Sequence, residues 1–438
     1  MKISVIGCGY LGAVHAASMA ELGHEVVGVD TDLAKIESLS AGRAPFFEPN
    51  LPELLERTLA SGRLSFTTDF ADVADAQVHF LCVGTPQKRG EYAADLAYVD
   101  GAFTSLLEVI APGALVAGKS TVPVGTAERL AAQLAEVQPD AMLVWNPEFL
   151  REGFAVKDTL HPDRLVYGVP DGEAGERATT LLDEVYAAIL AEGTPRLTMD
   201  PATAQLVKVA ANSFLATKIS FINAMAELCE RTDADVTALA DAIGLDDRIG
   251  RKFLNAGLGF GGGCLPKDIR AFMARAGELG ADQTLSFLAE VDAINTRRRV
   301  RMVDLAREEC GGSLMGRTVA VLGASFKPDS DDIRDSPALN VAEQLRLQGA
   351  NVRVTDPAAL GNAKSSYPNL LYVEDTEEAL TGADLVLLLT EWREYRELDP
   401  EAVGALVRRR ALLDGRNAVD PDRWRAAGWT YRALGRRA

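Results

Sequence analysis

Residues 2–12 read KISVIGCGYLG, an apolar run followed by closely spaced glycines and then by a helical pattern. Gly7 permits a tight turn, Gly9 lets a pyrophosphate approach the backbone, and Gly12 lets helix and strand pack closely. The N-terminus of the following helix stabilises phosphate charge. Asp30 ends the next apolar run, where its carboxylate can accept the ribose hydroxyls and would repel a 2'-phosphate. Because strand, glycines, helix and distal acid occur together, the segment predicts a dinucleotide site that favours NAD over NADP.

The same alternation of strand and helix patterns continues along the chain. Apolar runs read KISVIG, HEVVGVD, VHFLCVG, GALVAGKS and AMLVWN, then a long helical pattern intervenes, and TVAVLG, NVRVTD, DLVLLLT and ALLDG follow. Strands that alternate with helices form right-handed crossovers and parallel sheets covered on both faces. We therefore expect an α/β protein in which two Rossmann-like doubly wound parallel-sheet domains, residues 1–197 and 313–438, are joined by an all-helical central domain with a long helix, residues 198–312.

Composition and charge exclude several functional classes. The 438 residues carry a formal net charge of −18, which repels nucleic acid and anionic membranes. No apolar run approaches the roughly 20 residues that span a bilayer, and the first residues form a strand pattern rather than a signal peptide. Five scattered cysteines without a CxxC pair argue against a disulfide framework and a zinc site. We expect a cytoplasmic protein without a bound metal. The basic run at 297–301 is interpreted as a solvated helix face.

GFGGGCLPKD, residues 259–268, is the segment most informative about chemistry. A run of glycines this dense is costly in backbone entropy, so it is expected where another group must approach the backbone closely. Pro266 suits the first turn of a helix, so a helix is expected from near Leu265 toward Gly280, with Cys264 at its N-terminal edge. The helix dipole and the flanking amides lower the pKa of such a thiol. Cys264 is therefore a candidate nucleophile, although free cysteines are also commonly buried as packing residues.

Three polar residues stand at helical spacing near this candidate. Asp268 follows Cys264 by one turn, and Lys208 and Asn212 are four residues apart on one face of the long middle helix. Lys208 stands in a conspicuously apolar stretch, which favours a functional lysine over an ordinary surface lysine.

Eight motifs in sequence order resemble those of the UDP-glucose/GDP-mannose dehydrogenase family. They are GCGYLG, CVGTP at 82–86, STVPVGT at 120–126, NPEFLREG at 146–153, KVAANSF at 208–214, DDRIGRKFL at 246–254, GFGGGCLPKD, and ASFKPDSDDIRDSP at 324–337. The resemblance covers nearly the whole chain and implies an NAD-dependent oxidation of a UDP-sugar by four electrons. It implies that Cys264 captures the aldehyde made by the first hydride transfer, that the second transfer leaves a thioester, and that water hydrolyses it.

The resemblance also assigns roles to individual residues. The implied catalytic residues are Cys264, Lys208, Asn212, Asp268, Thr121 and Glu148. The cofactor-binding residues are Gly7, Gly9, Tyr10, Leu11, Gly12, Asp30, Lys35, Thr85, Pro86, Thr121, Glu152, Lys267 and Arg334. The substrate-binding residues are Glu148, Phe149, Leu150, Lys208, Asn212, Arg248, Phe253, Asn255, Gly261, Phe326, Lys327 and Arg416. Lys208 and Asn212 would stabilise the oxyanion. Arg248 would cross a subunit interface, which implies a homodimer or a larger homo-oligomer built on dimers.

Substrate identity is less constrained than mechanism. The GGGCLPKDIR stretch favours oxidation of UDP-glucose to UDP-glucuronate, and the alternatives are GDP-mannose and a UDP-N-acetylhexosamine. Gly263 stands where many relatives have a side chain, and Asn255 stands where some have lysine. Both departures bear on the identity of the sugar rather than on the mechanism.

The residues alone leave two more distant functional classes open. A two-electron β-hydroxyacid dehydrogenase would share the NAD domain and the helical middle domain, but it needs no cysteine nucleophile and leaves the third domain unexplained. A non-enzymatic NAD-binding scaffold would have no need of Cys264, Lys208, Asn212 and Asp268 together. The yield of NADH per sugar, two, one or none, separates the three classes.

Overall fold

The computed structural model describes residues 1–436 as two compact units. The first unit comprises Met1–Ala211 with Arg270–Gly280, and the second comprises Asn212–Ile269 with the chain from Ala281 onward. The predicted fold class is confirmed, because each unit contains a largely or wholly parallel sheet and helices fill the chain between the two sheets. The domain limits at 197 and 312 stay predictions.

The first unit is built on an eight-stranded sheet with the order β3-β2-β1-β4-β5-β6-β7-β8. Its strands are β1 Lys2–Ile6, β2 Glu25–Val29, β3 Leu64–Thr67, β4 Val78–Leu81, β5 Leu115–Gly118, β6 Met142–Trp145, β7 Leu165–Gly168 and β8 Arg196–Met199. Neighbouring strands run parallel except at β6 and β7, which pair antiparallel through Trp145 and Gly168. The strand order reverses between β1 and β4, the position at which such sheets bind ligands beyond the carboxyl ends of their strands.

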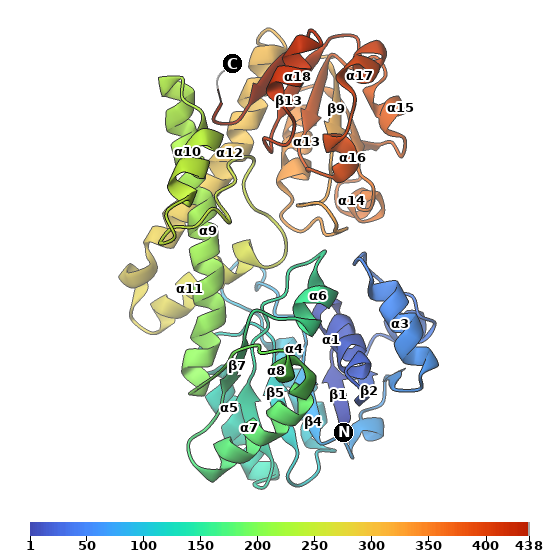
Figure 1. The fold of residues 1–438 in the computed structure, drawn as a ribbon, viewed down its shortest axis with the longest axis vertical. Coiled ribbons are helices and arrows are strands. Elements are labelled where there is room, and N and C mark those ends of the chain that lie inside the picture. The colour runs from blue at the N-terminus through green and yellow to red at the C-terminus, as the bar shows by residue number, and fades with distance from the viewer. Residues whose placement is uncertain (437–438) are drawn as a thin grey trace. The chain divides into compact units, whose positions relative to one another are not determined.

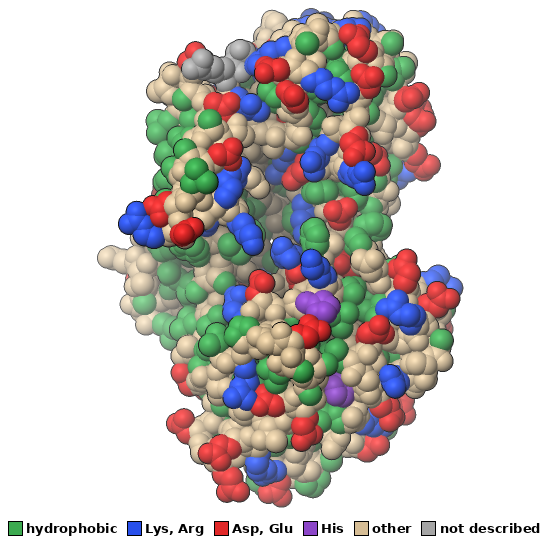
Figure 2. All heavy atoms as spheres, in the orientation of Figure 1, with side chains coloured by type: hydrophobic (Ala, Val, Ile, Leu, Met, Phe, Trp, Pro, Cys, Tyr) green, Lys and Arg blue, Asp and Glu red, His purple; other side chains and the backbone are tan. Residues whose placement is uncertain are grey.

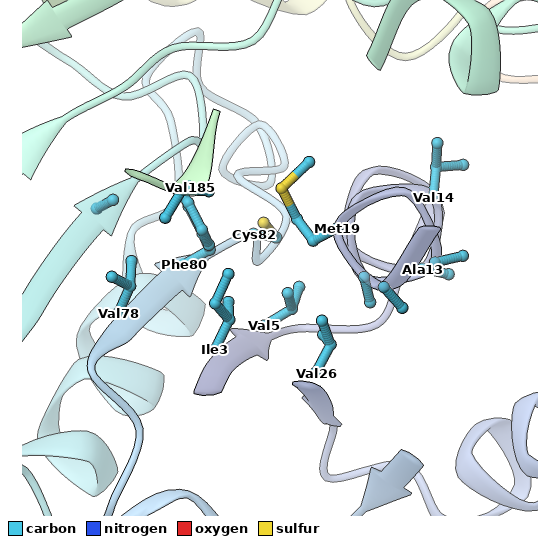
Figure 3. Packing of buried hydrophobic residues seen from close by; sticks show 14 of the residues in the cluster. Ile3, Val5, Ala13, Val14, Met19, Val26, Val78, Phe80, Cys82 and Val185 are labelled. Atoms are coloured by element: carbon cyan, nitrogen blue, oxygen red, sulfur yellow. The ribbon is translucent and has the colours of Figure 1, made fainter. Parts of the chain in front are cut away.

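Apolar side chains hold the helices of the first unit against this sheet. These helices are α1 Tyr10–Glu21, α2 Leu33–Ser40, α3 Leu51–Ala60, η1 Phe70–Val73, α4 Ala97–Leu107, α5 Thr126–Val137, α6 Ala155–Leu160, α7 Glu173–Val185 and α8 Ala187–Ala191. Val5, Val26 and Phe80 on the strands pack with Met19 of α1 in one buried cluster, as Figure 3 shows. The cluster fixes α1, and with it the glycine turn, over the centre of the sheet.

The middle of the chain is helical, and Figure 1 shows α9 as one continuous helix. The elements are α9 Pro201–Thr232, α10 Val236–Gly244, α11 Leu265–Glu278, η2 Asp282–Leu285 and α12 Phe287–Glu309. The division between the units falls within α9 and α11, so that Lys208 belongs to the first unit and Asn212 to the second. The expected long helix and the helix starting at Leu265 are both confirmed.

The second unit carries a six-stranded sheet with the order β11-β10-β9-β12-β13-β14, parallel throughout. Its strands are β9 Thr318–Leu322, β10 Asn351–Thr355, β11 Leu371–Tyr372, β12 Leu385–Leu388, β13 Ala411–Asp414 and β14 Thr430–Ala433. Its helices are α13 Pro337–Leu347, α14 Leu360–Ser366, α15 Thr376–Leu380, α16 Arg393–Arg396, α17 Pro400–Leu406 and α18 Pro421–Ala426. The order again reverses beside the first strand, β9, as in a second Rossmann-like sheet.

The interpretation of the basic run on α12 as a solvated face is wrong. Arg298 is fully buried and donates to Glu230 of α9 at 2.9 Å, and Arg301 donates to the same carboxylate at 2.7 Å. Arg299 is also buried and pairs with Asp335. Helical spacing indicated where these charges lie on α12, but it could not reveal that carboxylates from distant segments cover two of them.

The outer surface is mixed in charge. Figure 2 shows acidic and basic side chains interspersed over the face that it draws. Within residues 1–436, no helix combines the length and the apolar character needed to cross a membrane.

Candidate active site

The three glycines of the first turn have three different surroundings. Gly7 has a φ of +90°, and a Cβ there would lie 2.6 Å from a side-chain carbon of Val83. A Cβ on Gly12 would lie 1.8 Å from the carbonyl oxygen of Gly7, so only glycine lets α1 approach β1 this closely. A Cβ on Gly9 would meet nothing within 4 Å, which leaves its backbone open to a bound group. The turn thus fits a dinucleotide pyrophosphate at the N-terminus of α1.

Asp30 stands beside this turn at the end of β2. Its Oδ2 accepts the N–H of Cys8 at 2.8 Å and the ammonium of Lys35 at 2.7 Å, and its Oδ1 accepts the N–H of Asp32. These contacts fix the carboxylate where a ribose would pass. They also engage Lys35 with Asp30, so the lysine charge that would attract a 2'-phosphate is partly neutralised.

Glu48 is a buried residue that sequence reasoning missed. It accepts the N–H of Gly153 at 2.6 Å and the N–H of Ala155 at 2.7 Å, and the hydroxyl of Tyr10 also donates to it. It therefore ties the start of α1 to the NPEFLREG loop, in which Glu152 is buried as well. A lone acid in the segment FFEPN carries no motif, so its neighbours were not visible from sequence.

Lys208 and Glu148 form an ion pair of 2.9 Å within the first unit, and their side chains are only 7% and 15% exposed. Glu148 also accepts the N–H of Leu150 at 2.6 Å, and the ammonium of Lys208 lies 5.6 Å from the centre of the Phe149 ring. Elsewhere in the first unit, the Thr85 hydroxyl donates to the carbonyl of Thr121 at 2.8 Å. The structure therefore joins the predicted lysine of α9 to the NPEFLREG motif, and the CVGTP motif to the STVPVGT motif.

In the second unit, exposure distinguishes one thiol from the others. Cys264 is exposed immediately before α11, whereas Cys8, Cys82, Cys229 and Cys310 are buried. Burial raises the pKa of the Cys82 thiol to about 12 and raises those of the other three buried thiols. A protonated buried thiol is a poor nucleophile. Exposure therefore leaves Cys264 as the candidate nucleophile among the five cysteines.

Asp268, four residues after Cys264, accepts hydrogen bonds from one side-chain amide and one ammonium group. It is 2% exposed, its Oδ2 accepts the side-chain amide of Asn212 at 2.7 Å, and its Oδ1 accepts the ammonium of Lys267 at 2.6 Å. The hydrogen bond between Asn212 and Asp268 joins two of the predicted catalytic residues, and sequence spacing did not predict this contact. One amide hydrogen of Asn212 is thereby held, which fixes the direction in which the other points.

The glycines before Cys264 make room for other parts of the second unit. A Cβ on Gly259, which has a φ of +93°, would lie 2.2 Å from the amide oxygen of Asn295. A Cβ on Gly261 would lie 2.4 Å from the carbonyl oxygen of Asp335, and one on Gly262 would lie 2.8 Å from the Phe326 ring. A Cβ on Gly263 would lie 2.2 Å from the Arg334 guanidinium. The loop is thus enclosed by residues that the ASFKPDSDDIRDSP motif contributes.

Five further predicted substrate residues lie in the second unit. Arg416 donates to the carbonyls of Leu389, Gly259 and Phe326, at 2.8, 2.8 and 3.1 Å, and Lys327 lies over the Phe326 ring. Three others lie on the segment before the glycine loop. Arg248 is 89% exposed and pairs with Asp246, Phe253 has a φ of 66°, and Asn255 accepts from Arg251.

Comparison with known proteins agrees with this assembly of motifs. Residues 1–190, 202–297 and 320–421 match, in turn, the NAD binding, central and UDP binding domains of the UDP-glucose/GDP-mannose dehydrogenase family. A UDP-glucose 6-dehydrogenase of Rhizobium meliloti is 42% identical over 100% of both chains.

Two solved structures share the fold. A UDP-glucose dehydrogenase from Pyrobaculum islandicum has a TM-score of 0.90 and 40% identity, covering 99% of this chain and 98% of that one. A UDP-D-ManNAc dehydrogenase from Pyrococcus horikoshii has a TM-score of 0.86 and 28% identity, covering 100% and 99%. Together with the three domain matches in sequence order, these findings show that the chain belongs to the UDP-glucose/GDP-mannose dehydrogenase family.

Proposed function

We propose that this chain oxidises UDP-glucose to UDP-glucuronate in two successive hydride transfers, with Cys264 as covalent nucleophile. The observation that carries the proposal is the exposed Cys264 at the start of α11, four residues before the buried Asp268–Asn212 hydrogen bond. The 42% identity to a full-length UDP-glucose 6-dehydrogenase supports the substrate.

Cys264 solves a chemical problem that the second oxidation poses. NAD, held by the Gly7–Gly12 turn and Asp30, supplies the hydride acceptor for each oxidation. An aldehyde carbon can lose a hydride only after a nucleophile has made it tetrahedral. The thiolate of Cys264 adds to that carbon as a thiohemiacetal, loss of hydride converts the adduct to a thioester, and water releases the carboxylate and the thiol. Covalent capture also prevents escape of the aldehyde.

The polar residues of α9 and α11 are proposed to stabilise the charge that develops on the sugar oxygen. Lys208 and Asn212, one turn apart in α9, would donate to this oxyanion, and each such donor is worth about 3 to 4 kcal/mol. Asp268 keeps the Asn212 amide oriented. Glu148, which accepts from Lys208, is the candidate base for the hydrolytic water, and Thr121 is the candidate that positions it.

The second Rossmann-like sheet is proposed to bind the UDP moiety. Asp356 ends β10 in the position that Asp30 has in β2, but its carboxylate already accepts from the N–H groups of Ala324, Ser325, Ala358 and Ala359. A ribose would find this acid occupied, and the turn lacks the glycine pattern of the first unit. Phe326, Lys327 and Arg416 remain the proposed contacts for base and phosphate.

The oligomer is proposed to be a homodimer, or a larger assembly of dimers, formed through α9. Phe214, Phe221 and Leu228 recur every seven residues, so they lie along one face of the helix, and they are 67%, 49% and 54% exposed. An apolar stripe of this kind is stabilised when a second copy covers it. The same proposal assigns the enzyme to the cytoplasm, where its thiols would stay reduced.

A substrate panel tests the proposal. The purified chain is incubated with NAD and, separately, with UDP-glucose, UDP-N-acetylglucosamine and GDP-mannose, and NADH is counted per sugar consumed. We expect two NADH per UDP-glucose, with kcat/KM at least tenfold lower for the other two sugars. A yield of one NADH with release of a free aldehyde would exclude the thioester route, and preference for another sugar would correct the substrate alone.

A further inference from the structure

Lys119, directly after β5, is a buried cation that the proposed reaction does not use. Its side chain is among the buried polar residues, at 6% exposure. Its ammonium donates to the side-chain oxygen of Asn146 at 3.0 Å and to the hydroxyl of Tyr186 at 3.2 Å. It also lies over the rings of Phe80 and Tyr186, at 5.4 and 5.7 Å from their centres. Its hydrogen-bond partners are therefore neutral.

A cation in this environment is costly for folding. A buried charge is usually compensated by an ion pair, and replacing such groups by apolar residues of similar volume is often neutral or stabilising. The ammonium of Lys119 instead relies on two dipoles and two aromatic faces. Methionine has nearly the same shape and would pack here without that cost, so the position of the charge calls for a reason other than stability.

The contacts of Asn146 supply a reason. Its side-chain oxygen accepts from Lys119 and from Tyr186, at 3.0 and 2.7 Å, and its amide donates to the carbonyl of Val166 at 2.9 Å. Its backbone N–H also bonds Gly118. The side chain is thus held at three points immediately before the Pro147–Glu148 segment, in which Glu148 meets Lys208 at 2.9 Å.

We propose that Lys119 is a positioning residue for the oxidation: its ammonium fixes the side chain of Asn146, and Asn146 fixes the following segment, which presents Glu148 to Lys208. The inference rests on the proposed function for its kinetic consequences, and on the first unit alone for its geometry.

The charged and titratable groups around Lys119 come from every element packed on it. They are His15 of α1, Cys82 after β4, Glu148 after β6, Tyr186 after α7 and Lys208 of α9. Glu148 is the acid among them, and it interacts electrostatically with both Lys119 and Lys208. The positioning role therefore adds a second positive charge to the surroundings of the Glu148–Lys208 pair.

Lys119→Met tests the proposal. We expect kcat with UDP-glucose to fall at least tenfold, the KM for NAD to stay within twofold, and the melting temperature to be unchanged or raised. Introducing Lys119→Met into a Glu148→Gln background should cost no further activity, because both changes act on the same carboxylate. A purely structural lysine would lower kcat by the same factor in both backgrounds, and that result would overturn the proposal.

A control and a structural readout complete the test. Ser4→Ala removes another buried hydrogen bond of the same sheet, the one to His79 at 2.7 Å, and should leave kcat unchanged. The crystal structure of Lys119→Met should show Glu148 separated from Lys208; an intact pair would overturn the proposal. If the wild-type chain oxidises no UDP-sugar, the proposed function fails, while this crystallographic comparison still decides the role of Lys119.

Discussion

At the residue scale, differences in burial distinguish Cys264 from the other four thiols. Burial keeps Cys8, Cys82, Cys229 and Cys310 protonated near neutral pH because it raises their pKa values, whereas Cys264 is exposed at a helix start. A helix N-terminus favours the thiolate. The spacing of GFGGGCLPKD identified this cysteine correctly as standing at the start of a helix, and the structure adds the reason that no other thiol competes with it.

Cys264→Ser is expected to lower overall turnover about 10³-fold or more, as removal of a nucleophile typically does. The hydroxyl is a far weaker nucleophile toward the aldehyde, so no thioester forms. Binding of NAD, measured by fluorescence titration, should stay within twofold. Cys310→Ser, at a buried thiol, serves as the control and should keep wild-type turnover. Carboxylate production at the normal rate by Cys264→Ser would exclude covalent catalysis.

Asp30 provides a second prediction at the residue scale. Asp30→Ala removes the acceptor at the end of β2 and leaves Lys35 without its 2.7 Å ion pair. Hydrogen bonds to charged groups contribute about 1.5 to 3 kcal/mol, so kcat/KM for NAD should fall about 10- to 100-fold. The released lysine should also narrow the preference for NAD over NADP. Steady-state kinetics with both cofactors measure this ratio, and an unchanged ratio would mean that Asp30 does not select the cofactor.

At the element scale, the loop before Cys264 is held by side chains rather than by a sheet. Asn295 of α12 accepts the N–H of Phe260 and donates to its carbonyl, at 2.8 and 2.9 Å. Asn223 of α9 accepts the N–H of Gly257, and Asn417 after β13 donates to the carbonyl of Ala256. Irregular backbone that is buried needs such partners, since unpaired N–H and C=O groups are costly. Two helices and one strand end thus fix the approach to the nucleophile.

Asn295→Ala should release this loop. It leaves the buried N–H of Phe260 without its partner, while the carbonyl of Phe260 keeps the 3.3 Å hydrogen bond from Arg299. One unpaired buried group costs about 1 to 3 kcal/mol, so the free energy of unfolding should drop by about 1 to 3 kcal/mol. Because the loop leads to Cys264, kcat should fall as well while the KM for NAD holds. Asn340→Ala on α13, which removes a bond to Gln344, is the matched control. Urea unfolding and steady-state kinetics distinguish the two variants; equal effects would refute a special role of Asn295.

The elements that sequence could predict are those with a strong local pattern. The run VHFLCVG predicted β4 because a strand buried on both faces is apolar throughout, and Pro266 predicted the start of α11. The short strand β8, RLTM, was missed because it is mostly exposed and has no apolar run. Partners such as Glu48 for Gly153, or Asn295 for Phe260, lie 105 and 35 residues apart, and tertiary packing alone selects them.

At the scale of the whole molecule, Lys119 should make stability depend on pH. Burial lowers the pKa of its ammonium from 10.5 to about 8. Below pH 8 both the folded and the unfolded chain carry the proton, and the folded chain bears the full cost of the buried charge. Between pH 8 and 10.5 the unfolded chain binds more protons, so this contribution to stability rises with pH.

The wild type should therefore gain about 3 kcal/mol of unfolding free energy relative to Lys119→Met between pH 8 and 10.5, since one pKa unit corresponds to about 1.4 kcal/mol. Urea unfolding of both chains at several pH values measures this difference. Titrations that the two chains share, including those of the buried thiols and tyrosines, cancel in the comparison. A difference that stays constant across the window would mean that the folded and unfolded chains bind this proton equally, so that burial does not lower the pKa of Lys119.

The oligomeric state of the whole molecule can be tested through α9. Phe214, Phe221 and Leu228 expose one apolar face of a 32-residue helix, so a charge placed in its centre should prevent a second copy from covering it. We expect the wild type to sediment at twice the mass of one chain and Phe221→Glu to sediment as a monomer. Leu371→Glu, at a side chain that is 59% exposed but lies on β11, should remain a dimer. Because Arg248 is 89% exposed and is proposed to serve the other subunit, the monomer should also lose affinity for UDP-glucose. A wild-type monomer at micromolar concentration would remove both the dimer and this role of Arg248.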